Sequence, residues 1–398
     1  MRQELRIYDA AEYNLSQDML VAAPLTDIDR TYTITANQLL QYGEEHYVEL
    51  IDRYLTDTNI QQVVFRRLGD GIEIDVARII NNIVKFFVES ELLTIENFTY
   101  ITNIDCTALN LTKYRQLQKQ FPYLPEHLCS RDNTADLSGG CRHIWKHSDS
   151  QLALDVYPKN KNFLCFNRAL RLPRIVFMME LANRGLLEDT HASLRNPYNA
   201  ESEEKQVINS ILKKNQQWLD KTGFSSVSVE PLLDSMPLSL DYQVDRLFSL
   251  NAHDINLFNS SRVSIVNEAL FHSSHTEYLD VDELGTFLPF SLTSEKIIKC
   301  MMMGHPFLAV STPGHLESIR QLGYKTFHPV IDESYDLIQD DHARMQAVLT
   351  EIDRLNRYTE AEWLEFAAAI RDTVRYNQLV FKEKSIDVPY MSWLSDNA

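Results

Sequence analysis

The chain has 398 residues, of which 44% are hydrophobic and 10% aromatic, and its formal net charge is −18. This length is too great for one ordinary hydrophobic core and predicts two domains of roughly 150 to 230 residues. The negative charge argues against a general DNA- or RNA-binding protein, because such proteins carry a basic field.

Targeting signals and cysteine motifs are not evident in the sequence. No apolar run reaches the ~18 residues needed to span a bilayer, and the charged N-terminus lacks the apolar segment of a signal peptide. The five cysteines show no C-x-x-C spacing, which is typical of reduced thiols. We therefore expect no membrane span and a cytoplasmic location.

Glycine is scarce, with 11 residues in the chain. Neither G-x-G-x-x-G nor G-x-x-x-x-G-K-[ST] occurs, so the standard NAD and P-loop interpretations lose their main support. A nucleotide would have to be held by side chains and helix ends rather than by a glycine-rich loop.

The first half predicts an α/β layer. Residues 1–30 are irregular, and residues 31–55 predict a helix. Next come a strand at 59–65, an amphipathic helix at 75–91 and a strand at 98–103, an order that implies a parallel pair. Residues 124–150 are polar and without periodicity, which predicts a loop. We place the domain boundary at 157/158.

The second half alternates strands and helices from about residue 160 to 330, which is typical of a doubly wound parallel sheet. An acidic loop is expected at 271–292 and an irregular tail at 376–398. The predicted strands are 162–166, 263–267, 307–311 and 324–327, and the predicted helices are 174–184, 201–222, 294–303, 313–322, 333–357 and 359–375.

The segment from Thr293 to Ser311 predicts a capped helix, a glycine stop and a buried strand. Ser294 suits the N-cap, which leaves Glu295 and Lys296 in the first turn. Free N–H groups, a lysine and a carboxylate together could hold the phosphates and ribose of a nucleotide. The alternative is a solvated first turn in which the glutamate favours the helix start.

Further charged residues follow predicted strands, where ligands bind in open α/β sheets. Arg168, Arg171 and Arg174 follow the strand at 162–166, and arginine forks match phosphate oxygens. They could equally be surface arginines on an acidic protein. Glu268 ends the next strand, either facing a ligand or accepting a structural hydrogen bond.

Carboxylates that could serve as a general base follow the first two strands. Asp70 comes after the strand at 59–65 and Asp105 after the strand at 98–103, although each could be an ordinary turn residue. In the acidic loop, His272, His275, Asp280 and Asp282 invite a metal-site interpretation, but we favour a solvated loop.

The second half resembles the nucleotide-sugar domain of GT-B fold glycosyltransferases, particularly fucosyltransferase-type enzymes and related phage or giant-virus glycosyltransferases. The resemblance covers about residues 160–355 and rests on the segments FLCFNR, SIVNE, LTSEK with IIKCMMMGHPFLAV, and LGYKTFHPVIDESYD. It implies two Rossmann-like domains facing across a cleft, followed by C-terminal helices. The domains would span 1–157 on the acceptor side and 158–375 on the donor side, with a tail at 376–398.

The same resemblance implies a bacterial or viral hexosyl- or pentosyltransferase, in the host cytoplasm if viral. Glu295 would bind the donor's ribose, while Lys296 and Arg168, with Arg171, Glu268 and Ser294 nearby, would bind the diphosphate and stabilise the leaving group without a metal or other cofactor. A base from the N-terminal domain would activate the acceptor. We expect inversion by analogy.

The acceptor stays open between a glycan, a lipid-linked sugar, a protein and a hydroxymethylated viral DNA base, the last not favoured by the net charge. Two other functions are consistent with the sequence. One is a non-catalytic nucleotide- or sugar-binding protein of this fold, and the other is a metal-dependent transferase using Asp280 and Asp282.

Overall fold

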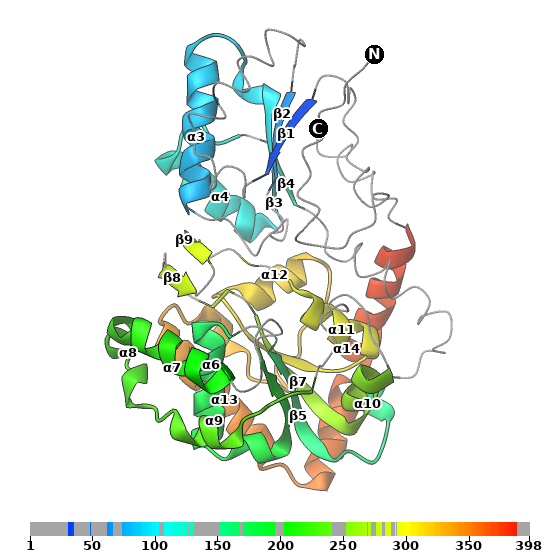
Figure 1. Cartoon of the computed structure of the whole chain (residues 1–398). Coiled ribbons are helices and arrows are strands. Elements are labelled where there is room, and N and C mark those ends of the chain that lie inside the picture. The colour runs from blue at the N-terminus through cyan, green and yellow to red at the C-terminus, as the bar shows by residue number, and fades with distance from the viewer. Residues whose placement is uncertain are drawn as a thin grey trace. The chain divides into compact units, whose positions relative to one another are not determined.

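The computed structural model describes residues 31–35, 48, 62–66, 74–102, 107–125, 127–130, 152–167, 170–195, 203–240, 252–268, 270–271, 276–280, 283–287, 291 and 293–387. The chain divides into two compact units, shown in Figure 1. The first contains Met1–Asp132, Gly285–Phe290 and Asp387–Ala398, and the second contains Asn133–Leu284 and Ser291–Ile386.

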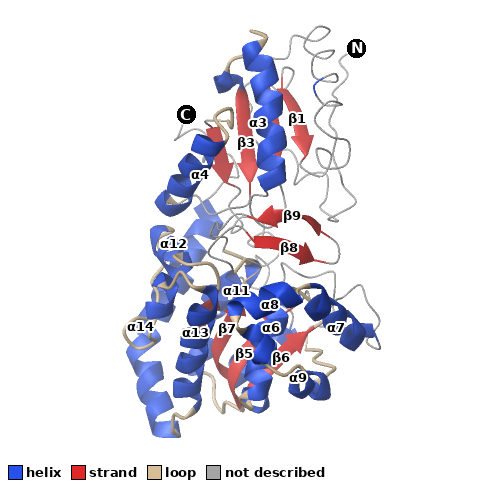
Figure 2. Ribbon diagram, turned by 90° about the vertical axis from the view of Figure 1, so that its left-hand side faces the viewer, coloured by secondary structure: helices blue, strands red, loops and turns tan. Residues whose placement is uncertain are grey.

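The first unit contains a four-stranded parallel sheet in the order β1-β2-β3-β4. Alternate residues of β2 and β3, such as Phe65 and Phe98, pack against the apolar face of α3, which lies over the sheet in Figure 2. The elements are β1 (Thr31–Thr35), β2 (Gln62–Arg66), α3 (Ile74–Glu89), η3 (Ile95–Asn97), β3 (Phe98–Thr102), α4 (Ala108–Gln120) and β4 (His127–Ser130).

The predicted β2–α3–β3 unit is confirmed, and its two strands are parallel. The predicted helix at 31–55 is wrong at its start, because β1 (TYTIT) consists of β-branched residues and a tyrosine, which favour a strand. The predicted loop at 124–150 contains β4, and α4 was not predicted. The expectation for residues 1–30 lies outside the described residues.

The second unit is built on another four-stranded parallel sheet, in the order β10-β7-β5-β6. Its strands are β5 (Lys161–Asn167), β6 (Thr190–Leu194), β7 (Ser261–Asn267) and β10 (Phe307–Val310). From β5 the chain goes first to β6 on one side and then to β7 on the other. The strand order therefore reverses between β5 and β7, and such a switch point is where open α/β sheets bind ligands.

Helices cover both faces of this sheet, so the predicted α/β class with a doubly wound second half is confirmed. Figure 1 shows β5 and β7 between α6 and α13 on one side and α10 and α11 on the other. The helices are α6 (Leu172–Asn183), α7 (Glu204–Lys214), α8 (Gln216–Thr222), α9 (Glu230–Ser235), α10 (Ala252–Ser260), α11 (Glu295–Met303), α12 (His315–Gln321), α13 (Asp341–Asn356) and α14 (Glu360–Asp387), with η4 (Ala153–Asp155), η5 (Leu186–Asp189), η7 (Phe224–Ser226) and η9 (Ser334–Leu337).

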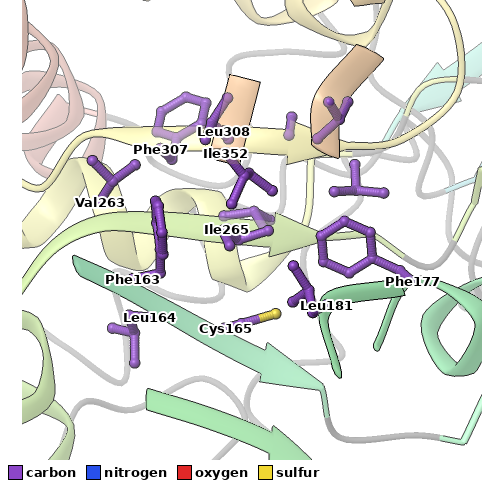
Figure 3. Packing of buried hydrophobic residues seen from close by; sticks show 14 of the residues in the cluster. Phe163, Leu164, Cys165, Phe177, Leu181, Val263, Ile265, Phe307, Leu308 and Ile352 are labelled. Atoms are coloured by element: carbon purple, nitrogen blue, oxygen red, sulfur yellow. The ribbon is translucent and has the colours of Figure 1, made fainter. Parts of the chain in front are cut away.

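The main core lies between the sheet and α6 with α13. In Figure 3, side chains of β5, β7 and β10, among them Phe163, Ile265 and Leu308, are packed together with Phe177 and Leu181 of α6 and Ile352 of α13. These three strands carry buried apolar side chains on both faces, as expected for parallel strands that are covered on both sides. This rigid layer fixes where the carboxyl ends of β5 and β7 lie.

The predicted α11–β10 segment is confirmed in detail. Ser294 is the N-cap of α11, and Gly304 ends the helix in the left-handed conformation with φ 60°. A Cβ at Gly304 would lie 2.5 Å from Leu152 Cδ2, so the close approach also requires glycine. Leu152 belongs to the core of the second unit, which therefore takes in residues before the expected boundary at 157/158.

Four other expectations for the second half need correction. The helix at 201–222 is two helices broken at Asn215, and residues 324–327 form no strand. The acidic loop contains β8 (Thr276–Asp280) and β9 (Glu283–Phe287), which form a two-stranded sheet. The last helix does not end at 375 but runs to Asp387.

Three consecutive residues just beyond that expected end hold earlier parts of the unit. Tyr376 Oη donates to Gly323 O at 3.2 Å, and Gln378 Nε2 donates to Met302 O at 3.1 Å. Between them, the Asn377 carboxamide accepts from Lys325 N and donates to Lys325 O, both at 2.8 Å. Because Asn377 takes both backbone groups of Lys325, it occupies the positions that a neighbouring strand would use.

Candidate functional site

Glu268 follows β7 directly and brings a carboxylate into the interior of the second unit. Its backbone N–H donates to Val310 O at 2.9 Å, which continues the β7–β10 pairing by one residue. The side chain is 2% exposed. Its Oε1 accepts from Ser294 N at 3.2 Å, whereas Oε2 has no hydrogen-bond partner among the described residues. Burial raises the pKa of Glu268, against the opposing effect of the Lys296 ammonium and the Ser294 hydrogen bond.

The first turn of α11 lies next to this carboxylate. Ser294 Oγ accepts from Lys296 N at 3.2 Å, as the N-cap role requires. Lys296 Nζ donates to Glu295 Oε1 at 2.9 Å. We call Glu268, Ser294, Glu295 and Lys296 the α11 site, a group that the structure brings together as the sequence suggested.

The Glu295 carboxylate and the Lys296 ammonium of the α11 site stabilise each other's charge. Burial alone would raise the pKa of Glu295, but the ammonium of Lys296, with help from Lys299, holds that pKa down at about 2. The Glu295 and Lys296 side chains are 17% and 11% exposed, so both reach the surface. The site therefore offers a fixed carboxylate, an ammonium and the positive end of a helix, the groups that hydroxyls and phosphates require.

Of the arginines expected after β5, Arg168 lies outside the described residues. Arg171 is the N-cap residue of α6, at the carboxyl end of the sheet, and is half-buried. Arg174, in the first turn of α6, is 4% exposed. Burial raises the pKa of the Cys165 thiol to about 12, and the charge of Arg174 works against this rise, so Arg174 faces the interior near β5.

Two buried asparagines at the same edge were missed by the sequence analysis. Asn167 ends β5 and Asn267 ends β7, and both are fully buried. Asn167 Oδ1 and both polar atoms of Asn267 have no hydrogen-bond partner among the described residues. The signal was present in the sequence, because the segments NFLCFN and SRVSIVN are apolar toward their ends and both finish in asparagine.

Two buried side chains hold the segments around the α11 site in place. Arg344 of α13, 1% exposed, donates to Ser311 O at 3.0 Å and to Phe271 O, which joins the segments that follow β10 and β7. His315 Nδ1 lies 2.8 Å from Ser291 Oγ, which joins the start of α12 to the segment before α11. Side chains of α12 and α13 thus hold in place the segments at the carboxyl end of the sheet.

Most of the residues considered as a general base or as metal ligands lie outside the described residues. Asp70 and Asp105 lie outside the described residues, although β2 and β3, which precede them, are adjacent and parallel. Asp280 ends β8, while His272, His275 and Asp282 also lie outside. Within the described ranges, no group of three or more His, Cys, Asp or Glu side chains is placed to hold a metal ion.

No model of a known protein family matches the chain, and no curated protein sequence matches it. Solved structures give weak likenesses. An α,α-trehalose-phosphate synthase (UDP-forming) from Burkholderia vietnamiensis is 13% identical, with a TM-score of 0.36, covering 88% of this chain and 74% of that one. A glycosyltransferase from Rickettsia africae is 10% identical, with a TM-score of 0.30, covering 87% and 82%.

A chain assigned as a UDP-N-acetylglucosamine 2-epimerase from Listeria monocytogenes is 11% identical, with a TM-score of 0.29, covering 89% of this chain and 82% of that one. With TM-scores below 0.5, these likenesses establish neither a shared fold nor a shared activity. Among the described helices, none combines the length and the apolar character needed to cross a membrane.

Proposed function

We propose that this chain is a glycosyltransferase whose second unit binds a nucleotide-diphosphate sugar at the α11 site. The observation that carries the proposal is the buried carboxylate of Glu268, which lies beside the Glu295–Lys296 pair. One of its oxygens accepts a hydrogen bond from Ser294 N at the start of α11. The other oxygen has no partner among the described residues. The site lies at the carboxyl end of β7, next to the point where the strand order reverses.

Each group has a distinct role in this proposal. Glu295, kept ionised by Lys296, accepts hydrogen bonds from the ribose hydroxyls. Lys296 binds the diphosphate and shares its ammonium with Glu295, and Arg168 and Arg171, which follow β5, add positive charge. Because Lys296 is already paired, its charge is oriented before the ligand arrives, which lowers the cost of organising the site.

The reaction then needs a base but no metal. An acceptor O–H attacks the anomeric carbon while a carboxylate takes its proton. The bond from that carbon to the diphosphate oxygen breaks, and its electron pair leaves with the diphosphate, whose charge Lys296 stabilises. We assign the base to Asp70 or Asp105 of the first unit, and we propose inversion at the anomeric carbon.

A thermal-shift panel tests donor binding directly. UDP-, GDP-, ADP- and CMP-linked sugars are added to the full chain, and one class should raise the melting temperature, since a ligand at 100 times its Kd adds about 2.7 kcal/mol of stability. If no nucleotide or nucleotide sugar shifts the transition, the proposal is wrong.

Donor hydrolysis and transfer, with and without EDTA, then separate the three functions. Turnover that survives chelation supports the proposal, loss on chelation supports a metal-dependent transferase, and tight binding without turnover supports a non-catalytic binding protein. Asp70→Asn and Asp105→Asn are compared with Asp75→Asn, whose side chain pairs with Arg78 on the surface of α3 at 2.6 Å. The variant lacking the base should lose at least ~100-fold in kcat and keep its donor affinity.

A further inference from the structure

The two central strands of the second sheet end in matching asparagines. β5 pairs with β7 at Lys161↔Ser261, Phe163↔Val263 and Leu164↔Ser264, a constant offset, so Asn167 and Asn267 each lie three residues beyond the last paired position. Side chains alternate along a strand, so Asn167 points to the same face as Phe163, and Asn267 to the same face as Val263. Both carboxamides therefore lie on the face covered by α6, as the contact of Asn167 with Met178 shows.

Neither carboxamide is satisfied by the described part of the chain. Asn167 Nδ2 reaches two sulfur atoms, Cys165 Sγ at 3.2 Å and Met178 Sδ at 3.3 Å, which are weak acceptors. Its Oδ1 and both polar atoms of Asn267 have no partner among the described residues, although both asparagines are fully buried. Buried polar groups without partners destabilise a folded chain, and their presence calls for a ligand, water or ion that the protein alone does not supply.

The strands also part at this point. Of the seven residues in each strand, β5 and β7 pair no further than Leu164 and Ser264, while β5 stays paired with β6 as far as Asn167, and β7 with β10 as far as Asn267. Figure 3 shows β5 and β7 drawing apart toward their carboxyl ends. The unsatisfied carboxamides thus lie at the carboxyl ends of the strands where the strand order reverses, the position that open α/β sheets use for ligands.

The chemistry of these groups selects a neutral partner. Asn167 Oδ1 accepts, and the Asn267 carboxamide both donates and accepts, so the complementary group is one that does both, which a hydroxyl or a water molecule does. Neither carboxamide carries a charge to balance a phosphate. A charged group would instead be bound by Glu295 and Lys296 of the α11 site, which lies on the opposite face of β7 from Asn267. Glu268 is one residue further along the chain than Asn267, so its side chain points to that opposite face, where it contacts the start of α11.

We propose that Asn167 and Asn267 form a recognition site for a hydroxyl group of the sugar that is transferred, reached through an ordered water that the two carboxamides hold. A buried water of this kind makes about three hydrogen bonds and transmits nearly the full strength of a direct one. This inference rests on the proposed function, since the sugar is the neutral, hydroxyl-rich part of the donor.

Asn267→Leu tests the site, because leucine has the same number and branching of side-chain heavy atoms as asparagine and no polar atom. Asn377→Leu is the matched control, since Asn377 is also a buried asparagine but has both polar atoms bonded to Lys325. For each full-length variant, the melting temperature is measured without ligand, and Kd is measured for UDP, GDP and ADP and for UDP-glucose, GDP-mannose and ADP-glucose. Asn267→Ala serves as a second variant if the leucine variant does not fold.

The expected result separates the two asparagines. Asn267→Leu should keep or raise the melting temperature, bind the preferred nucleoside diphosphate like the wild type, and lose about tenfold of the preference for the sugar-linked form. Asn377→Leu should melt at a lower temperature and keep the sugar preference.

Three results would decide against the inference or its basis. A melting temperature lowered in Asn267→Leu as much as in Asn377→Leu would make Asn267 structural. An unchanged sugar preference would also overturn the inference, whether the variant binds nucleoside diphosphate and sugar-linked donor as the wild type does or loses the same affinity for both. A wild-type chain that binds none of the six nucleotides would instead overturn the proposed function.

Discussion

Polar side chains lie in the interior at both ends of the strands of the second sheet, which we call its amino edge and its carboxyl edge. The two edges differ in whether these side chains find hydrogen-bond partners within the chain. At the amino edge, His305 Nε2 lies 3.1 Å from Ser261 O and its Nδ1 lies 2.9 Å from Ser264 Oγ. Lys159 Nζ donates to Ala153 O at 2.6 Å and to Asn259 O at 2.9 Å. At the carboxyl edge, by contrast, Asn167, Asn267 and Glu268 keep buried atoms without partners among the described residues.

This contrast distinguishes two roles of buried polar groups. Polar groups whose partners come from the chain hold the fold together, and their loss costs stability. Polar groups left without partners destabilise the free protein, and a ligand or an ordered water can supply their hydrogen bonds. We therefore expect changes at the amino edge to act on unfolding and changes at the carboxyl edge to act on binding.

The largest expected effect is the loss of stability in acid that comes from His305. Because a carbonyl oxygen can only accept, His305 Nε2 carries the hydrogen and donates to Ser261 O, and the ring is neutral. Burial, with the nearby Lys159, lowers the pKa of His305 from 6.5 to about 3. Between these values the unfolded chain binds a proton that the folded chain does not, so stability falls as the pH drops through this window.

Urea unfolding of the wild type and of His305→Gln between pH 7 and pH 4 measures this contribution. The difference between the two pH profiles should approach the order of 3 kcal/mol at pH 4. Donor affinity at pH 7 should be the same in both proteins. Parallel pH profiles, or a lost affinity in the variant, would break the contrast between the edges.

Next in size is the effect of Lys296→Ala on donor binding. Removing this ammonium should weaken nucleoside diphosphate binding 10- to 100-fold, about 1.4 to 2.8 kcal/mol, because a charge-assisted contact is lost. Lys299→Ala is the control, since Lys299 lies one turn further along α11 and faces Asp254 at 3.8 Å. Equal affinities of the two variants by calorimetry would remove the phosphate assignment.

A smaller effect concerns Glu295, whose carboxylate the charge of Lys296 stabilises despite burial. Its pKa is lowered from 4.5 to about 2, so its contribution is present above pH 4.5 and is lost as the pH falls toward 2. Because the side chain is partly exposed, we expect about 1 to 2 kcal/mol. Glu295→Gln should lose that amount at pH 7 and show a flatter acid profile than wild type, and an unchanged profile would contradict the pairing.

The smallest expected effect sharpens the contrast at Glu268. Burial raises the pKa of this carboxyl group, so its ionised form at pH 7 destabilises the fold, and that cost disappears as the pH falls through the raised pKa. Glu268→Gln keeps an oxygen that can accept from Ser294 N and removes the charge. The free energy of unfolding at pH 7 should rise by up to ~1 kcal/mol, while donor affinity falls. A destabilised variant would make Glu268 a structural group.

The elements that the sequence predicted well are those in which local signals and burial agree. In α11, the Ser294 cap, the apolar run and Gly304 all indicate one helix, and three of the four residues of the α11 site, Ser294, Glu295 and Lys296, follow from it. Lys296 and Glu295 are neighbours in sequence and pair with each other, while Glu268 is added by the β7–β10 pairing. Whether these residues bind a donor stays a prediction.

The missed features depend on contacts between distant parts of the chain. Residues 324–327 look like a strand, but Asn377 takes the hydrogen-bonding groups of Lys325, 52 positions earlier. The asparagines that end β5 and β7 could be related to each other only once the strand order made β5 and β7 neighbours. Neither the order of the strands nor the separation of their carboxyl ends can be predicted from the local periodicity of hydrophobic residues.

The three side-chain contacts made by residues 376–378 have a consequence for synthesis of the protein. The segments that they hold, at Met302 and at 323–325, are made more than 50 residues before them. While the chain is still on the ribosome, these backbone groups must be bound by water or by transient partners. The second unit therefore completes these hydrogen bonds only after residues 376–378 have left the ribosome, and nascent chains ending before residue 376 should be more sensitive to protease than chains that include these residues.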